Sequence, residues 1–475
     1  MNQSQPTVYM KKQLFIGLFF LASAVISCVE QPVEPVDVSP NPNLEINGWI
    51  HDQMKTYYLW TDQMTPKAST DLTLSPDEYF ESLLVKPGEL DRFSWIEKSA
   101  TELINSLQGR NVVLGVRTSA FFTNASQQNV AYAISYVLKG SPAEKAGLKR
   151  GDFITKVNNV ALTPENFATA LAPESLQLTL GTWNEATREI VPNDRVISVT
   201  KTEVQTNPIQ FSTVVERENK KIGYLVYLQF LSAFDNGLRE VFADFKAKGV
   251  NELVLDLRYN GGGAISSAVT LSSLIVKNLS ENNIMYKDQW NKEITDYFVQ
   301  RNGANFFNRY FKNEPDNLGS LQRVYVLTSR STASASELVI NSLKPYMEVI
   351  VIGDNTAGKN VGSITIQDEN KRWEWGLQPI VLKTLNALGQ SDYGTVNGFT
   401  PNIVQKDNVL PFQPFASENE TLFRLALEHI TQKPVASATA ARLRAQRPLP
   451  QASREFLSDN PLENRKEMWI TELPK

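Results

Sequence analysis

Three short segments of the chain carry residue types that could perform hydrolytic chemistry. Each follows an apolar run that predicts a buried strand, and the three are Asp256–Gly263 (DLRYNGGG), Thr328–Glu337 (TSRSTASASE) and Gly353–Lys359 (GDNTAGK). The C-terminal ends of parallel strands gather at one edge of an open α/β sheet, where binding sites collect. We therefore expect the three segments to meet in one site.

The glycine-rich turn at Gly261–Gly263 is a candidate binding element for an anion. Such a turn at the start of a helix exposes backbone N–H groups, which suit either a phosphate or the charge that develops on a carbonyl oxygen during hydrolysis. The segment lacks the Lys-Ser/Thr ending of a P-loop and the glycine spacing of a dinucleotide-binding turn. Nucleotide binding is therefore disfavoured.

The other two segments supply a possible nucleophile and a possible base. Small residues in Thr328–Glu337 let a side-chain hydroxyl approach a substrate backbone, although a serine-rich cap followed by Glu337 is the simpler interpretation. A serine nucleophile needs a base, and the only two histidines, His51 and His429, lie far from these segments in the sequence. Lys359, otherwise an ordinary surface lysine, can serve if burial lowers its pKa. Deprotonating an unperturbed lysine at neutral pH costs about 4 to 5 kcal/mol, a shift that desolvation can supply.

The composition limits the classes of function. The 475 residues are 42% hydrophobic and 21% charged with a net charge of −4, an ordinary globular balance without the long basic run typical of a nucleic-acid surface. The single cysteine, Cys28, excludes an intramolecular disulfide framework and a multi-cysteine metal site. The sequence indicates no cofactor, no metal and no nucleic-acid partner.

The first residues indicate export. Two lysines precede the apolar run Leu14–Ile26, which is too short to span a membrane comfortably and has the anatomy of a signal peptide. Val25–Cys28 resembles a bacterial lipobox, so we expect residues 1–28 to be a lipoprotein signal and Cys28 to be lipidated, with a proline-rich tether at 29–42. A plain signal peptide with an incidental cysteine and an uncleaved anchor are the alternatives. A lipid-anchored protein would belong to the bacterial cell envelope, facing the periplasm or the outer surface.

The rest of the chain must position the three segments. Apolar residues at helical spacing from Leu44 to Trp60 predict a helix, and short β runs follow it. Strands then alternate with helices, which is typical of a predominantly parallel α/β layer. The fold class is therefore a multidomain α/β protein. The expected parts are a small helical domain at 43–110, a β-rich domain at 111–205, an α/β core at 206–432 and a loosely held tail at 433–475.

The β-rich part resembles a bacterial PDZ domain. The resemblance rests on Gly140–Asp152 (GSPAEKAGLKRGD) and the strand Phe153–Val157 that follows. PDZ domains bind an extended chain terminus as an added strand while backbone amides hold its carboxylate. The resemblance makes Leu114, Gly115 and Val116 the candidate carboxylate loop, although this loop has fewer glycines than is usual. A purely architectural PDZ-like unit is the alternative.

The chain as a whole resembles the C-terminal processing peptidases, or tail-specific proteases. Three separated motifs occur in the family's order, namely Asp256–Gly263, Thr332–Glu337 and Thr356–Lys359, and Asp91–Trp95 (DRFSW) extends the likeness over about residues 43 to 430. The resemblance implies a serine endopeptidase with a core similar to those of ClpP and crotonase. It also implies polypeptide substrates with free C-terminal tails, which the PDZ domain would capture.

The resemblance further implies a role for each site residue. Ser334 would be the nucleophile and Lys359 the general base of a Ser-Lys dyad that works through an acyl-enzyme. The oxyanion hole would combine the N–H of Ala335 with one from Gly262 or Gly263, and Glu337 and Thr356 would have supporting roles.

Two departures from the family pattern are present. Ser363 stands where many relatives have the glutamine that orients the lysine, and Pro345 stands where many have aspartate. A catalytically silent PDZ-containing scaffold that binds polypeptide tails or another ligand remains an alternative. A hydratase-like enzyme fits poorly with an export signal, and a metal hydrolase lacks a His-x-x-x-His motif or a carboxylate cluster. The sequence indicates no particular substrate or oligomeric state.

Overall fold

The computed structural model describes residues 41–435 and 467–470. The chain divides into two compact units, Met1–Asn41 and Pro42–Lys475, and nearly all the described residues belong to the second. The expected signal peptide, its lipidation site Cys28 and almost all of the tether lie outside the described residues. None of the helices within the described ranges combines the length and the apolar character needed to cross a membrane.

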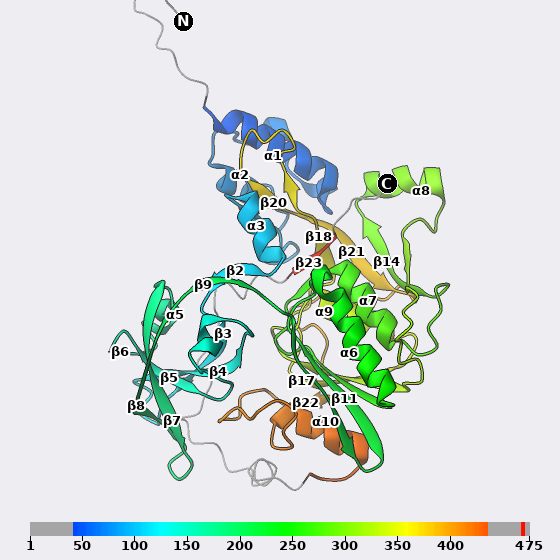
Figure 1. The fold of residues 1–475 in the computed structure, drawn as a ribbon. Helices are drawn as coiled ribbons and strands as arrows, with labels where there is room; N and C mark the ends of the chain where they lie inside the picture. The colour runs from blue at the N-terminus through cyan, green and yellow to red at the C-terminus, as the bar shows by residue number, and fades with distance from the viewer. Residues whose placement is uncertain (1–40, 436–466, 471–475) are drawn as a thin grey trace, which may run out of the picture. The chain divides into compact units, whose positions relative to one another are not determined.

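The first described region is largely helical (Figure 1). Its elements are α1 (Asn43–Tyr57), short 3-10 turns at Thr61–Gln63 and Lys67–Ser69, α2 (Pro76–Ser82), β1 (Trp95–Glu97) and α3 (Ala100–Leu107). At the start of α2, the carboxylate of Glu78 accepts a hydrogen bond from the backbone N–H of Ser75 (3.3 Å), which caps the helix. The region is not helical throughout, because β1 pairs antiparallel with β20 (Gly376–Gln378) at the edge of a separate three-stranded sheet.

The β-rich region, the expected PDZ domain, forms an antiparallel sheet. In spatial order its strands are β3 (Val116–Phe122), β4 (Val130–Val137), β5 (Phe153–Val157), β7 (Ser175–Asn184) and β8 (Glu189–Thr200), and β6 (Val160–Ala161) pairs with β5. Two short helices, α4 (Pro142–Lys145) and α5 (Phe167–Ala170), interrupt it. A ladder of β2 (Arg110–Val113) and β9 (Thr202–Gln205) joins the two ends of the region. Within this sheet β3 is an edge strand.

A six-stranded sheet forms the centre of the α/β region. In spatial order its strands are β10 (Ile209–Arg217), β11 (Lys220–Tyr227), β12 (Glu252–Asp256), β16 (Arg323–Thr328), β17 (Glu348–Gly353) and β22 (Ile403–Val404). All neighbours run parallel except β10, which is antiparallel to β11. The predicted parallel layer is therefore confirmed.

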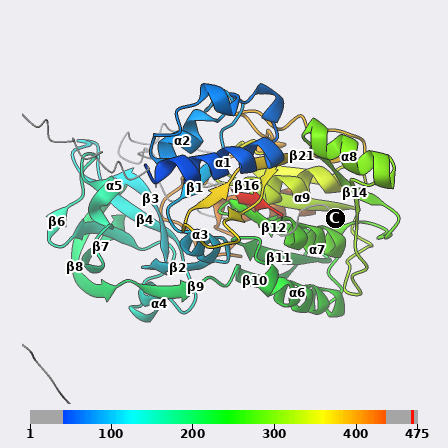
Figure 2. The same cartoon turned by 90° about the horizontal axis from the view of Figure 1, so that it is seen from above.

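Helices cover both faces of this sheet because alternate strand residues point to opposite sides. Leu225 and Leu255 pack against α6 (Asp235–Ala247), α7 (Ile265–Ile275) and α9 (Ala335–Leu343). Tyr224 and Val254 pack on the other side against α10 (Thr421–Thr431). Figure 2 shows α7 and α9 side by side on their face of the sheet.

A second sheet is mixed and includes a strand that the sequence did not predict. In spatial order it contains β13 (Gly262–Ala264), β23 (Glu467–Trp469), β18 (Val361–Ser363), β21 (Ile380–Asn386), β14 (Ile284–Trp290) and β15 (Asn308–Tyr310). Helix α8 (Lys292–Asn302) follows β14, and β19 (Ile366–Gln367) pairs with β20. The expectation of a loosely held tail at 433–475 is wrong for β23, which is a strand inside this sheet, drawn in red in Figure 1.

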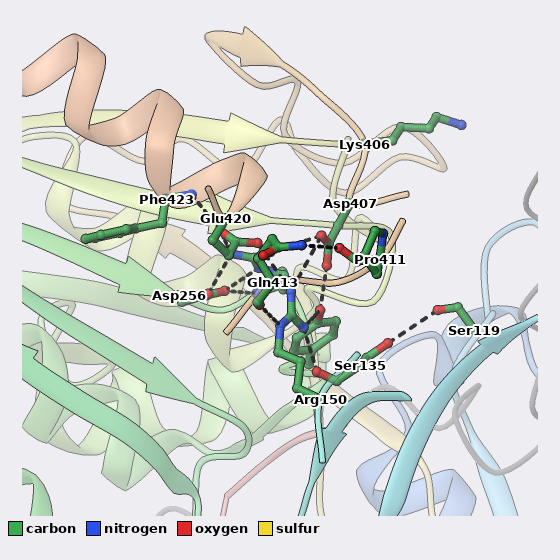
Figure 3. Close-up of polar contacts among 12 residues, drawn as sticks. Ser119, Ser135, Arg150, Asp256, Lys406, Asp407, Pro411, Gln413, Glu420 and Phe423 are labelled. Atoms are coloured by element: carbon green, nitrogen blue, oxygen red, sulfur yellow. Dashed lines mark hydrogen bonds and ion pairs between the residues drawn. The ribbon is translucent and has the colours of Figure 1, made fainter. Parts of the chain in front are cut away.

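A buried cluster of charges joins the PDZ domain to the core (Figure 3). Arg258 is fully buried and pairs with Asp256 (2.9 Å), Asp407 (3.1 Å) and Glu420 (2.7 Å). Arg150 of the PDZ domain reaches the same Glu420 carboxylate at 3.3 Å. Removing one partner of a buried ion pair leaves an uncompensated charge in a poorly solvated place, so this cluster fixes the contact between the two domains.

We predict that Arg258→Met destabilises the fold by about 3 to 5 kcal/mol, because three buried carboxylates lose their shared counter-charge. The exposed pair between Lys248 and Asp244 provides the matched control, and Lys248→Met is expected to change the free energy of unfolding by less than about 1 kcal/mol. Chemical denaturation of both variants measures the difference. Equal stabilities for the two variants would show that the buried cluster does not stabilise the fold.

Candidate active site

Ser334 occupies a strained position immediately before α9. Its backbone has φ +66° and ψ −116°, a region that residues other than glycine rarely adopt and that persists only where the surroundings enforce it. The side chain is buried, and its Oγ has no hydrogen-bond partner among the described residues. Ser334 is also the N-cap residue of α9, in a capping box with Glu337, so the cap that was the simpler interpretation of the sequence is present as well.

The carboxylate of Glu337 holds the serine and lysine segments together. Its Oε2 accepts hydrogen bonds from the backbone N–H groups of Ser334 (2.8 Å) and Lys359 (2.8 Å). Its Oε1 accepts from the Gly358 N–H (2.7 Å) and the Thr356 hydroxyl. Burial raises the pKa of the Glu337 carboxyl, and these four hydrogen bonds act in the opposite direction. The arrangement brings both candidate catalytic segments to one side chain.

Lys359 is fully buried beside an aromatic ring from the N-terminal region. Its Nζ lies 5.1 Å from the centre of the Phe93 ring, and the Arg92 guanidinium donates to the Gly358 carbonyl (2.5 Å). Asp91 accepts hydrogen bonds from the N–H groups of Phe93 and Ser94, which fixes this segment. The Asp91–Trp95 motif therefore forms part of the surroundings of the lysine. No hydrogen bond joins Ser334 Oγ to Lys359 Nζ within the described structure.

Neither histidine belongs to this arrangement. His51 lies on α1, where its Nε2 is 3.1 Å from the carbonyl oxygen of Thr65. His429 lies on α10, where its Nδ1 is 3.0 Å from the hydroxyl of Tyr325. Both histidines therefore lie in other contacts, as expected if neither is the base.

The glycine turn is tied to the serine segment through Asn260. The carbonyl oxygen of Asn260 accepts hydrogen bonds from the Ala333 N–H (3.1 Å) and the Ser336 hydroxyl (3.1 Å). Its side-chain oxygen accepts from the Gly262 N–H (2.9 Å), so this N–H is already used. The other glycine proposed for the oxyanion hole, Gly263, lies opposite Met468 of β23, and Ala335 is the first residue of α9, whose N–H has no acceptor within the helix.

Gly263 is required by its backbone. It has φ +140°, and a Cβ at this position would lie 2.3 Å from the carbonyl oxygen of Phe230. Phe230 also exchanges hydrogen bonds with the Gly262 carbonyl and the Ala264 N–H, both at 2.9 Å. Peptide groups alternate in direction along a strand, so those of Gly263 face the opposite edge of β13.

A glutamine from elsewhere in the chain contacts Ser363. Gln378 is buried at the end of β20, and its Nε2 donates to Ser363 Oγ (2.8 Å), while its Oε1 accepts from the Thr365 hydroxyl (2.7 Å). In the sequence, Ser363 replaces the glutamine that many relatives have. The structure places a different glutamine, Gln378, in contact with Ser363.

The proposed PDZ loop lines a groove. Leu114, Gly115 and Val116 border a groove with a volume of about 490 Å³ between β3 and α5, together with apolar residues that include Phe167 and Leu171. Gly115 has φ +89°, and a Cβ there would lie 2.1 Å from the Cβ of Ser141. The groove runs along the edge strand of the PDZ sheet, where an extended chain could add as a strand.

A further contact connects this groove with the serine segment. Arg117, which follows the loop in β3, donates to the hydroxyl of Ser331 (2.7 Å), three positions before Ser334. The PDZ domain therefore contacts both the serine segment and the buried charge cluster.

Three family models match the chain in the order expected from its fold. They are the peptidase S41 N-terminal domain at residues 45–95, a PDZ domain at 134–183 and peptidase family S41 at 221–404. The chain belongs to peptidase family S41. The S41 match contains the glycine turn, Ser334, Glu337 and Lys359, and the N-terminal match contains the Asp91–Trp95 motif.

Individual relatives agree with this family. A Bacteroides fragilis protein described as an S41 protease has a crystal structure with a TM-score of 0.69 and 29% identity, covering 81% of this chain and 97% of that one. The chloroplastic carboxyl-terminal-processing peptidase 2 of Arabidopsis thaliana is 26% identical over 53% of this chain and 46% of its own length. A CtpA-like serine protease of Staphylococcus aureus is 25% identical over 50% of this chain and 44% of its own length. The chain spans about half the length of these curated relatives.

The structure brings most of the predicted site residues together and adds several contacts that the sequence did not predict. The structure brings Ser334, Ala335, Glu337, Thr356 and Lys359 together around one carboxylate, and it places the glycine turn beside them through Asn260. From the sequence, Glu337 had only an unspecified support role. The contact of Phe93 with the lysine and that of Gln378 with Ser363 were not predicted. Only the Asp91–Trp95 motif signalled any of these in advance.

We predict that Glu337→Gln lowers the free energy of unfolding by about 1 to 3 kcal/mol. The amide NH₂ would replace one carboxylate oxygen, and it cannot accept the hydrogen bonds that this oxygen accepts in the parent. Burial raises the pKa of Glu337 in the folded state. The Glu337 carboxyl therefore keeps its proton to a higher pH in the folded chain than in the unfolded chain. As the pH rises from the pKa of the unfolded chain through that of the folded chain, the stability advantage of the parent over Glu337→Gln decreases. Glu348→Gln, at an exposed position of β17, is the matched control.

Chemical denaturation at a series of pH values checks this prediction. If the Glu337 and Glu348 variants have the same stability, the carboxylate does not hold the two segments together.

Proposed function

We propose that this S41 family member is a serine endopeptidase that cleaves polypeptides near their C-terminal regions. Ser334 Oγ attacks the peptide carbonyl while Lys359 Nζ takes its proton, and an ester joins Ser334 to the acyl part of the substrate. The proton is then given to the departing amine. Water hydrolyses the ester, with Lys359 again accepting a proton, and Ser334 is restored.

The single observation that carries this proposal is the shared carboxylate of Glu337. It accepts hydrogen bonds from the backbones of both Ser334 and Lys359, so neither residue can move far without breaking a buried interaction. Around this carboxylate, Ser334 has a strained backbone and a buried Oγ, and Lys359 is enclosed beside Phe93. Strain and burial of this kind are typical of reactive sites. A base must be neutral to accept a proton, and burial of an amine favours its neutral form.

The oxyanion of the reaction would be stabilised by two backbone donors. The N–H of Ala335 lies at the start of α9, where the helix dipole also favours negative charge. The N–H of Gly263 is the second donor, since that of Gly262 is taken by Asn260. Fixed donors of this kind stabilise the charge that develops on the substrate carbonyl.

The PDZ domain would capture the substrate by its C-terminal end. The groove between β3 and α5 has apolar walls and begins at the loop around Gly115, whose backbone amides would receive the terminal carboxylate. Relatives are named for processing of carboxyl termini, which supports substrates of this type. We further propose that the protein is exported and lipidated at Cys28, which places its substrates in the cell envelope.

We predict that Ser334→Ala and Lys359→Met each reduce cleavage at least about 1,000-fold, because one removes the nucleophile and the other removes the base. The substrate is an unstructured protein with an apolar C-terminal tail, and mass spectrometry follows the products. Lys406→Met, at an exposed lysine, is the matched control and retains parental activity. The parental rate should rise with pH as the base loses its proton.

A rate that is constant from about pH 5 to 9 would contradict the role of Lys359 as a base. A parent that binds the tail without cleaving it would instead support the catalytically silent scaffold.

We predict that Gly115→Ala weakens binding of a C-terminal peptide more than about tenfold. The new Cβ would overlap Ser141 and displace the loop that receives the carboxylate. Gly140→Ala is the matched control, because Gly140 also has positive φ (+75°) but has open space around its Cβ position. Fluorescence anisotropy of a labelled peptide with a free carboxylate measures the affinities, and an amidated copy tests the dependence on the terminus. Equal affinities for the two glycine variants would exclude this groove as the binding site.

A further inference from the structure

Strand β23 joins the two parts of the candidate active site. It runs parallel to β13, where Glu467, Met468 and Trp469 lie opposite Gly262, Gly263 and Ala264 in turn. On its other side Trp469 lies opposite Ser363 of β18. Among the described residues, β23 is what connects β13, which carries the candidate oxyanion glycine, with β18, which follows Lys359.

The backbone of this segment is held on the side of β18 by Ser363. The hydroxyl of Ser363 donates to the carbonyl oxygen of Met468 (3.1 Å), and the carbonyl oxygen of Ser363 accepts from the Ile470 N–H (3.1 Å). On the side of β13, Met468 stands opposite Gly263, whose peptide groups face this edge. The segment therefore uses main-chain pairing on both sides, as an extended polypeptide bound by strand addition would.

The side chains of the segment are seated in apolar surroundings. Met468 is fully buried in the main core, and Ile470 packs against the same core. Trp469 packs against Leu103 and Leu107 of α3 and against Ala264. Met468 and Trp469, which are successive residues of β23, therefore lie in two different apolar environments. The side chains of an extended peptide bound as a strand would alternate between two such environments.

We propose that residues 467–470 occupy the substrate-strand site of the peptidase and act as an intramolecular competitor for substrate. This inference rests on the proposed function, because it takes the gap between β13 and β18 as the place where the substrate backbone lies. The segment stands opposite the donor that would stabilise the oxyanion, so a substrate strand cannot pair with Gly263 until β23 leaves.

Competition of this kind has a defined kinetic signature. The apparent affinity for substrate equals the affinity of the open site multiplied by the fraction of molecules in which the site is open. The chemical step in the open molecules is unchanged. Weakening β23 is therefore expected to lower KM and leave kcat unaltered. A strand that merely completes the fold would give the opposite result, since its loss would lower kcat or unfold the core.

The first experiment uses the full chain with Trp469→Asp, which places a charge in the apolar contact with α3 and so disfavours the bound strand. We expect kcat/KM for the unstructured substrate to rise at least tenfold, through KM. Tyr297→Asp is the matched control, because Tyr297 is an exposed aromatic residue on α8, and it should leave both constants unchanged. Unchanged constants in Trp469→Asp, or a fall in kcat, would overturn the proposal.

The second experiment does not depend on cleavage. A labelled peptide with the sequence of residues 465–472, amidated so that it lacks the carboxylate that the PDZ groove would hold, is added to full chains that carry Ser334→Ala. We expect it to bind at least tenfold more tightly when Trp469→Asp is also present, and a scrambled peptide to bind equally weakly to both. Equal affinities for the peptide would overturn the proposal. If the parent cleaves no substrate while this binding difference is found, the proposed function fails and the occupancy of the site by β23 stands.

Discussion

The site depends on one buried carboxylate. Glu337 accepts hydrogen bonds from Ser334 at one end of a loop and from Gly358 and Lys359 at the end of another, so two segments that follow neighbouring parallel strands are fixed at a common point. A carboxylate can accept several hydrogen bonds at once, which an amide or a hydroxyl cannot do to the same extent. The strained backbone of Ser334 is tolerated because its own N–H is held by this carboxylate and the N–H of the preceding Ala333 is held by the Asn260 carbonyl.

Much of this candidate site could be predicted from the sequence because its residues lie in short contiguous motifs. The motifs around Gly263, Ser334 and Lys359 are each contiguous, and each follows an apolar strand. The parallel arrangement of those strands then requires that the three motifs meet at one edge of the sheet. The PDZ domain was equally visible, since the helix and strand that identify it are adjacent in the chain. The α/β core and the three motifs could therefore be predicted from the sequence, whereas the roles of the site residues stay predictions.

The parts that were missed depend on contacts between distant residues. The pairing of Gln378 with Ser363 and the approach of Phe93 to Lys359 leave no periodic pattern in the sequence. Strand β23 has only three residues, and the region before it is rich in Ala, Pro and Arg, so local propensity gave no reason to expect a strand. Its pairing is decided by partners at Gly262–Ala264 and Ser363, more than 100 positions away.

The charge cluster around Arg258 has a consequence for how the molecule folds. Arg150 belongs to the PDZ domain, yet its guanidinium completes the surroundings of Glu420 and Tyr259 in the core. If the PDZ domain separated or unfolded alone, the buried Glu420 carboxylate of the core would lose the positive charge of Arg150. The two domains are therefore coupled in their thermodynamics, and partial unfolding of either one is expected to propagate to the other, so that they behave as one cooperative unit.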